Sequence, residues 1–179
     1  MRQLVVQRQS SFSGDRKVGF DTNVLVAVID KPIMQSDKID YMFSKGLFYV
    51  HQLVKNETIN RLRKPPFNKT YTKEKVEKFI NKKNMILLKK IPAYEHPTLK
   101  FLIQKCKENS IVIENRDLAD LQIVADYLAN GINRVFSGDG KMVKMCKAVG
   151  IDAEFFWKLK FTEQQKEDVK TALQQLHHK

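Results

Sequence analysis

Short apolar runs alternate with amphipathic stretches along most of the chain. The runs predict strands at residues 17–20, 47–50, 85–88, 133–137 and 151–155. The run at 85–88 is continuously apolar, which predicts a buried strand, although a short buried helix shows the same pattern.

Between these runs, apolar residues recur three and four positions apart, which predicts helices with one face in the core. These helices cover residues 23–29, 37–44, 51–62, 72–80, 97–106, 117–129, 140–149 and 162–178. Strands and helices that alternate in this way indicate an α/β fold, with a central parallel sheet flanked by helices on both faces. Binding sites in such folds form at the carboxyl ends of the strands.

The composition fits one folded domain of 179 residues, with 42% hydrophobic residues, 7 Gly and 5 Pro. No apolar run approaches a membrane span and the N-terminus has no secretory pattern, so no membrane association and a cytoplasmic location are expected. Cys106 and Cys146 are predicted to be buried free thiols. The four histidines show no metal-ligand spacing and are assigned no role.

The positive charge is concentrated in one segment. Residues 55–107 hold 15 Lys and Arg against four Glu, whereas the net charge of the whole chain is +12. A cluster of this size predicts a polyanionic partner such as a nucleic acid. The candidate nucleic-acid contacts are Arg61, Arg63, Lys64, Lys69, Lys82 and Lys83, with Lys141 from a later segment.

Four acids occur at the ends of predicted core elements. Asp21 and Asp139 each follow an apolar strand, and Glu57 and Asp120 lie on helices. If the fold brings the four carboxylates together, their repulsion calls for a counter-charge. Oxygen ligands of this kind suit Mg²⁺ or Mn²⁺. A bound ion of this type can activate water against a phosphodiester.

Each acid also has a simpler interpretation. Asp21 and Asp139 are well placed to cap the helices that follow them. Glu57, on a Lys-rich helix, could be an ordinary solvated side chain. Asp117 competes with Asp120 because it lies one turn earlier on the same face.

Several motifs together resemble the PIN domain. They are Asp21-Thr22-Asn23-Val24-Leu25, the helical Glu57, the run from Asp120 to Ala125 with Gly131 beyond it, and Phe136-Ser137-Gly138-Asp139. The resemblance covers residues 17–156. It includes a basic helical insertion at about 63–107, with an N-terminal extension at 1–16 and a C-terminal helical extension at 157–179.

The resemblance implies an endoribonuclease that cuts single-stranded RNA and leaves a 5′-phosphate. Asp21, Glu57, Asp120 and Asp139 match the acids that bind one or two divalent ions. Thr22 or Asn23, and Ser137, match positions that steady these acids through hydrogen bonds. Small members of the family include the VapC toxins, so the implied partners are RNA, an acidic antitoxin or another protein, and a second copy of the chain.

Two departures from the family pattern leave alternatives open. Lys141 and Met142 follow Gly140, where the family often has a further acid and then Phe. The segment between Glu57 and Asp120 is also longer and more basic than in a minimal toxin. A degenerate PIN domain that binds RNA or protein without cutting is the main alternative. A receiver domain or a haloacid-dehalogenase-like phosphatase ranks low, because Thr22 and Asn23 follow Asp21 where those folds require a further acid.

Overall fold

A computed structural model describes residues 16–177 and shows a five-stranded parallel sheet in the order β3-β2-β1-β4-β5. The strands are β1 (Lys17–Phe20), β2 (Leu47–His51), β3 (Ile86–Leu88), β4 (Arg134–Ser137) and β5 (Asp152–Phe155). The predicted α/β class with a parallel sheet is confirmed. Because all strands run in one direction, their carboxyl ends meet at one edge of the sheet.

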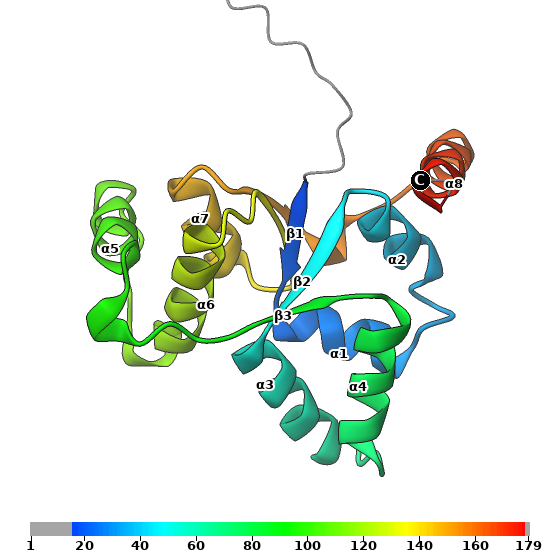
Figure 1. The fold of residues 1–179 in the computed structure, drawn as a ribbon, viewed down its shortest axis with the longest axis horizontal. Coiled ribbons are helices and arrows are strands. Elements are labelled where there is room, and N and C mark those ends of the chain that lie inside the picture. The colour runs from blue at the N-terminus through cyan, green and yellow to red at the C-terminus, as the bar shows by residue number, and fades with distance from the viewer. Residues whose placement is uncertain (1–15, 178–179) are drawn as a thin grey trace, which may run out of the picture.

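Helices cover both faces of the sheet. The helices are α1 (Thr22–Asp30), α2 (Ser36–Phe43), α3 (Gln52–Arg63), α4 (Thr72–Lys82), α5 (Leu99–Glu108), α6 (Leu118–Ala129), α7 (Gly140–Ala148) and α8 (Glu163–His177). Figure 1 shows α5, α6 and α7 on one side of the strands and α1 and α2 on the other. Within residues 16–177, no helix combines the length and apolarity that crossing a membrane requires.

The sheet is held tightly against α6. Gly19 on the central strand β1 has no space for a side chain, since an added Cβ would lie 2.8 Å from the ring of Tyr127. The fully buried Tyr127 hydroxyl donates a hydrogen bond to the carbonyl of Phe20 at 2.8 Å. This contact fixes α6 against the end of β1. Both cysteines are buried and free, as predicted.

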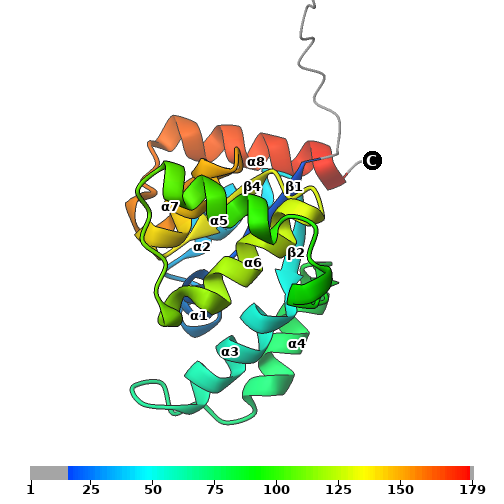
Figure 2. The same cartoon turned by 90° about the vertical axis from the view of Figure 1, so that its left-hand side faces the viewer.

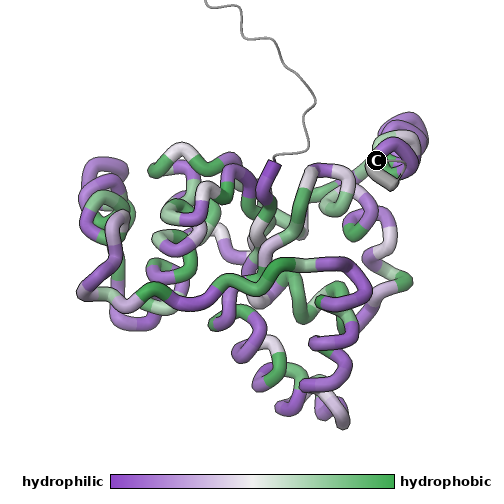
Figure 3. The backbone as a smooth tube through the Cα atoms, in the orientation of Figure 1, coloured by the Kyte–Doolittle hydropathy of each residue, from purple (hydrophilic) through white to green (hydrophobic). Residues whose placement is uncertain are grey.

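The strand at 85–88 is confirmed as a strand but not as a buried one. β3 pairs with β2 at the edge of the sheet, and Ile86 and Leu87 are 44% and 45% exposed. An edge strand is covered on fewer sides than a central one, which explains the difference. The terminal helix α8 is mainly hydrophilic (Figure 3), as its sequence predicted.

Helices α3 and α4 project together from one end of the sheet, away from α8 (Figure 2). We call this pair of helices, residues 52–82, the basic arm. The arm begins directly after β2, so it stands beside the carboxyl ends of the strands. The predicted domain boundaries remain predictions, and most of the extension at 1–16 lies outside the described residues.

Candidate active site

Asp21 lies at the carboxyl end of β1 and is 4% exposed. One carboxylate oxygen caps α1 by accepting from the Val24 N–H at 3.1 Å. The other accepts from the Ser137 hydroxyl and from the Gly138 N–H at 3.0 Å. Burial raises the pKa of Asp21 despite these hydrogen bonds, and the charge of Asp139 adds to the rise. Asp21 therefore caps α1 and also lies beside a second acid, Asp139.

Asp139 follows β4 and caps α7, accepting from the N–H groups of Lys141 at 2.6 Å and Met142 at 3.2 Å. Its own N–H donates to the Ser137 hydroxyl oxygen at 2.9 Å. Ser137 thus connects Asp21 with Asp139, which is consistent with the supporting position predicted for it.

Glu57 is the acid that faces the site from the basic arm. It accepts from the Thr22 hydroxyl at 2.8 Å and pairs with the Arg61 guanidinium at 2.9 Å. Arg61 also donates to the Asn23 side chain. Thr22 and Asn23 therefore tie the start of α1 to α3, and Glu57 is not a free solvated side chain.

Asp117 and Asp120 have different environments. Asp117 accepts from the Glu114 N–H at 2.8 Å and from Lys141 Nζ at 2.7 Å. The Lys141 hydrogen bond lowers the pKa of Asp117. Asp117 therefore has a local partner. The carboxylate of Asp120, in the first turn of α6, has no hydrogen bond or ion pair in the described part of the chain.

The electrostatics of Asp120 connect the four predicted acids. Burial raises its pKa to about 6, and the charges of Asp139, Asp21, Glu57 and Asp117 add to the rise in that order. Acids that follow β1 and β4, lie on α3 and precede α6 influence one carboxyl group only when the fold places them around it. A carboxyl group perturbed in this way by neighbouring charges is typical of a functional site.

Asp120→Asn is expected to raise the stability of the metal-free protein at pH 7.5. The folded-state pKa of about 6 exceeds the ordinary value of 3.8, so wild-type stability falls as the pH rises between these values. The neutral amide avoids this loss. Allowing for partial exposure, we expect about 1 kcal/mol, or a melting temperature roughly 2–4 °C higher.

Thermal melts at several pH values test this expectation. The gain should shrink as the pH falls and disappear below about pH 4, where wild-type Asp120 is also neutral. Asp40→Asn serves as the control, because Asp40 lies on α2 and is not among the acids whose charges act on Asp120. A variant that melts below the wild type at pH 7.5 would contradict the repulsion among the acids.

The donor chemistry suits a hard divalent cation, because every candidate ligand is a carboxylate oxygen. Within residues 16–177, however, no group of three or more His, Cys, Asp or Glu side chains is arranged to hold a metal ion. Two cations already neutralise part of the acidic charge, Arg61 on Glu57 and Lys141 on Asp117. Binding of an ion by more than two acids therefore requires side chains to turn.

The predicted nucleic-acid contacts are not equally available. Arg63 donates to the Thr72 hydroxyl at 2.9 Å, and Lys69 pairs with Asp30 at 2.7 Å. Lys83 lies 4.7 Å from the ring centroid of Phe43. Lys64 and Lys82 are exposed on the basic arm. Arg61 and Lys141 lie among the acids themselves.

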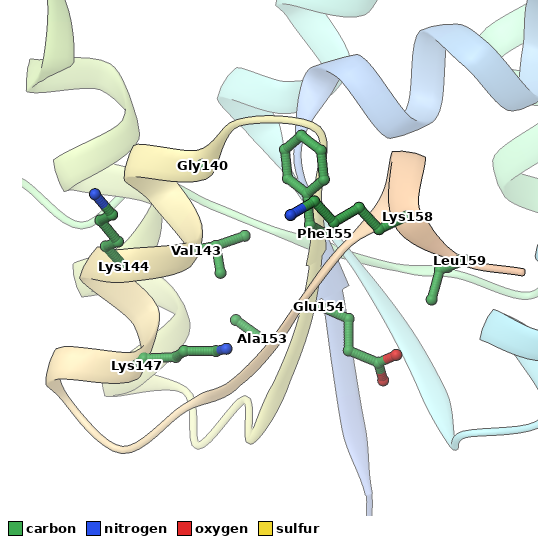
Figure 4. A pocket seen from close by; sticks show the side chains of 9 residues that line it. All are labelled: Gly140, Val143, Lys144, Lys147, Ala153, Glu154, Phe155, Lys158 and Leu159. Atoms are coloured by element: carbon green, nitrogen blue, oxygen red, sulfur yellow. The ribbon is translucent and has the colours of Figure 1, made fainter.

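A groove of about 660 Å³ runs between α7 and β5, beginning at Gly140 beside Asp139. In Figure 4, Lys147 extends toward Ala153 from the helix, and Lys158 reaches back across Phe155. Lys144 also lines this groove, which we call the lysine groove. The acid in it, Glu154, already pairs with Arg134 at 2.7 Å. No pattern in the sequence indicates that α7 and the end of β5 form one basic surface.

The assignment of no role to the histidines is wrong for His51 and His96. Both are buried and bind the fully buried Asp126, at 2.7 Å and 2.9 Å. Each Nδ1 accepts a backbone N–H, from Leu53 at 3.1 Å and Thr98 at 3.3 Å. Both rings therefore carry the proton on Nε2 and donate it to Asp126. We call these three residues the histidine node.

Comparison with protein-family models and with curated proteins finds no match. Among solved structures, the chain is similar to VapBC2 from Rickettsia felis, determined bound to a DNA fragment from its promoter. The match covers 77% of this chain and 97% of the other, with 14% sequence identity and a TM-score of 0.56. At this identity the similarity shows the fold alone, which is PIN-like.

Proposed function

We propose that the chain is a PIN-domain endoribonuclease that uses Mg²⁺ or Mn²⁺ to hydrolyse phosphodiester bonds of single-stranded RNA. The observation that carries the proposal is the gathering of Asp21, Glu57 and Asp139 around Asp120 at the carboxyl ends of the strands. Burial and these neighbouring charges raise the pKa of Asp120, which agrees with that arrangement. The PIN-like fold and the basic surfaces beside these acids support it. Asp21, Glu57, Asp120 and Asp139 would hold one or two ions.

When bound, the ion supplies a water of lowered pKa and offsets negative charge on the phosphate. The residues of the chain then have separate tasks. Asp21 and Asp139 are fixed by Ser137 and by helix N–H groups, so they form the rigid side of the site. Glu57 approaches from the basic arm together with Arg61, whose guanidinium is paired with it and would turn to contact a phosphate.

The direct test is hydrolysis of a single-stranded RNA labelled at both ends, with Mn²⁺, with Mg²⁺ and with a chelator. We expect cleavage only with an ion, and products that carry a 5′-phosphate. A double-stranded RNA and a single-stranded DNA of the same sequence define the substrate class. Cleavage that continues undiminished in the chelator would contradict the proposal.

Specific ion pairs favour a second candidate, a degenerate PIN domain that binds RNA or protein without cutting. Lys141 and Arg61 place positive charge where an ion would otherwise lie. Isothermal titration with Mn²⁺ separates the two candidates. Binding at micromolar concentrations that Asp120→Asn removes supports the nuclease, whereas RNA binding without any metal binding supports the degenerate domain.

Replacing Lys147 and Lys158 together by Ala is expected to weaken RNA binding without abolishing hydrolysis. Two lost phosphate contacts should reduce the slope of log affinity against log salt by about 1.4. Fluorescence anisotropy at several salt concentrations measures this slope. The matched control is the double variant Lys166→Ala and Lys170→Ala on α8, whose lysines pair with acids of the chain. An equal loss of RNA affinity in both double variants would show that the lysine groove does not bind RNA.

The positive charge of the chain also suits an acidic protein partner. An antitoxin-like peptide that covers the acids would bring acidic residues to Arg61 and the lysine groove. A second copy of the chain is a further proposed partner, and sedimentation analysis of the protein alone tests it.

A further inference from the structure

A second cavity, of about 300 Å³, adjoins the acids on the side of α1. Asn23 and Arg61 form its wall on the acidic side, and Arg61 pairs with Glu57 at 2.9 Å. Trp157 closes it from the turn that follows β5. Its indole lies so close to Gly138 that a Cβ there would be 2.9 Å from Nε1. Gly138 itself donates to Asp21, so the indole that closes the cavity lies next to the site.

The cavity is lined by aromatic rings from distant parts of the chain. Trp157 is 46% exposed, and Phe67 reaches the same cavity from the loop after α3. Phe156 packs edge to face against the indole, with the ring centroids 4.9 Å apart. Lys38 Nζ lies 5.8 Å from the centroid of the Trp157 ring. These contacts hold the indole in place while leaving part of it open. Open aromatic faces beside basic residues bind the bases of single-stranded nucleic acids.

A polar atom buried in the wall of the cavity also lacks a partner. Gln35 lines the cavity, and its Oε1 is buried without a hydrogen-bond partner among residues 16–177. Buried acceptors in proteins are nearly always paired. Every RNA base carries at least one N–H donor, so once the half-buried Gln35 side chain turns toward the cavity, a base that stacks on Trp157 can supply the hydrogen bond that its Oε1 lacks.

We propose that this cavity receives one unstacked base of the RNA strand whose phosphate lies at the acids, with Trp157 as the stacking platform and Gln35 as a specificity-determining contact. The identity of the strand rests on the proposed function. Lys31 and Arg61, at the cavity wall, carry the positive charge that the adjoining phosphates require.

The intrinsic fluorescence of the full chain tests the proposal, because Trp157 is its single tryptophan. Short single-stranded RNA is added in a chelator, so that nothing is cut, while the anisotropy of a labelled strand records binding separately. We expect a base-containing strand to quench Trp157, and an abasic strand of equal length to bind without quenching. A free mononucleotide should quench only at much higher concentration, and quenching as strong as that by the strand would overturn the assignment to a strand.

Two variants and a control complete the test. Trp157→Ala should weaken binding of the strand about tenfold, and Trp157→Phe should restore most of it. Phe101→Ala, on α5 and equally exposed at 46%, should leave binding unchanged. Gln35→Leu should narrow the differences in affinity among the four homopolymers. Quenching by the abasic strand, or unchanged binding in Trp157→Ala, would overturn the proposal.

The failure of this inference and of the proposed function can be told apart. If wild type cuts RNA while Trp157→Ala binds it normally, the base cavity is wrong and the nuclease stands. If bases quench Trp157 but no ion supports hydrolysis, the base cavity stands on a domain that binds RNA without cutting.

Discussion

Asp21→Asn is expected to lower RNA hydrolysis at least 100-fold while the protein stays folded. Asp21 is the most buried of the four acids, at 4% exposed, and Ser137 and Gly138 hold its orientation. An amide keeps one oxygen but loses the charge that a divalent ion needs. Hydrolysis rates with Mn²⁺, compared between variant and wild type under single-turnover conditions, measure the loss.

The control for this variant must separate lost chemistry from lost structure. Asn at position 21 keeps one acceptor for three N–H or O–H donors, so we expect a stability loss of about 1 kcal/mol from the weakened cap. Asp120→Asn avoids this complication, because it should lose hydrolysis while gaining stability. Glu74→Gln, an exposed acid on the basic arm, should cut RNA at the wild-type rate. Equal rates in wild type and Asp21→Asn would refute the nuclease proposal.

Asp126→Ala is expected to destabilise the protein by about 3–5 kcal/mol, because it leaves His51 and His96 buried without a partner. The same carboxylate accepts from the Ile91 N–H at 3.1 Å and from Gln122 at 3.0 Å. One side chain thus joins the end of β2, the loop before α5 and helix α6. Urea unfolding at pH 7 measures the change, with Asp40→Asn as the control.

The direction in which pH changes this stability loss can also be predicted. Burial opposes ionisation of Asp126, but the hydrogen bonds from His51, Gln122 and Ile91 outweigh it and lower its pKa. A lowered carboxyl pKa adds stability above the ordinary value of 3.8, and this is lost as the pH falls through the folded-state value. The stability difference between wild type and Asp126→Ala should therefore narrow in acid. A difference that stays constant down to pH 2 would contradict the ionised node.

The histidine node also bears on the site. Asp120 lies on the first turn of α6 and Asp126 on a later turn, while Glu57 lies on α3 just beyond His51. Loss of the node should therefore shift Asp120 relative to Glu57. Asp126→Asn keeps part of the hydrogen bonding and is expected to be less destabilised than Asp126→Ala. A lower hydrolysis rate of this variant at saturating RNA would reveal the shift.

Local patterns predicted the strands and helices well, because burial on one face of an element leaves a period in the sequence. The acids at 21 and 139 could be located for the same reason, since each follows an apolar strand. Glu57 could be included only through a resemblance, and its contact with Thr22 spans 35 residues of sequence.

Features that depend on contacts between distant segments produce no periodic pattern in the sequence. His51 and His96 reach Asp126 across 75 and 30 residues, and nothing near either histidine indicates an acid. The exposure of Ile86 and Leu87 depends on β3 lying at the sheet edge, which is a property of strand order. In the sequence, Lys141 indicated only that an acid common in the family is missing two residues after Asp139. In the fold, Lys141 forms an ion pair with Asp117.

The position of the basic arm has a consequence for kinetics. Its lysines lie along α3 and α4, beside the acids and not among them. Under the proposed function they would therefore act on the approach of RNA. Charges of this kind accelerate encounter, and salt screens them over a Debye length of about 8 Å at physiological ionic strength. Rising salt should therefore slow the association of RNA steeply, while the cleavage rate of RNA already bound stays nearly constant.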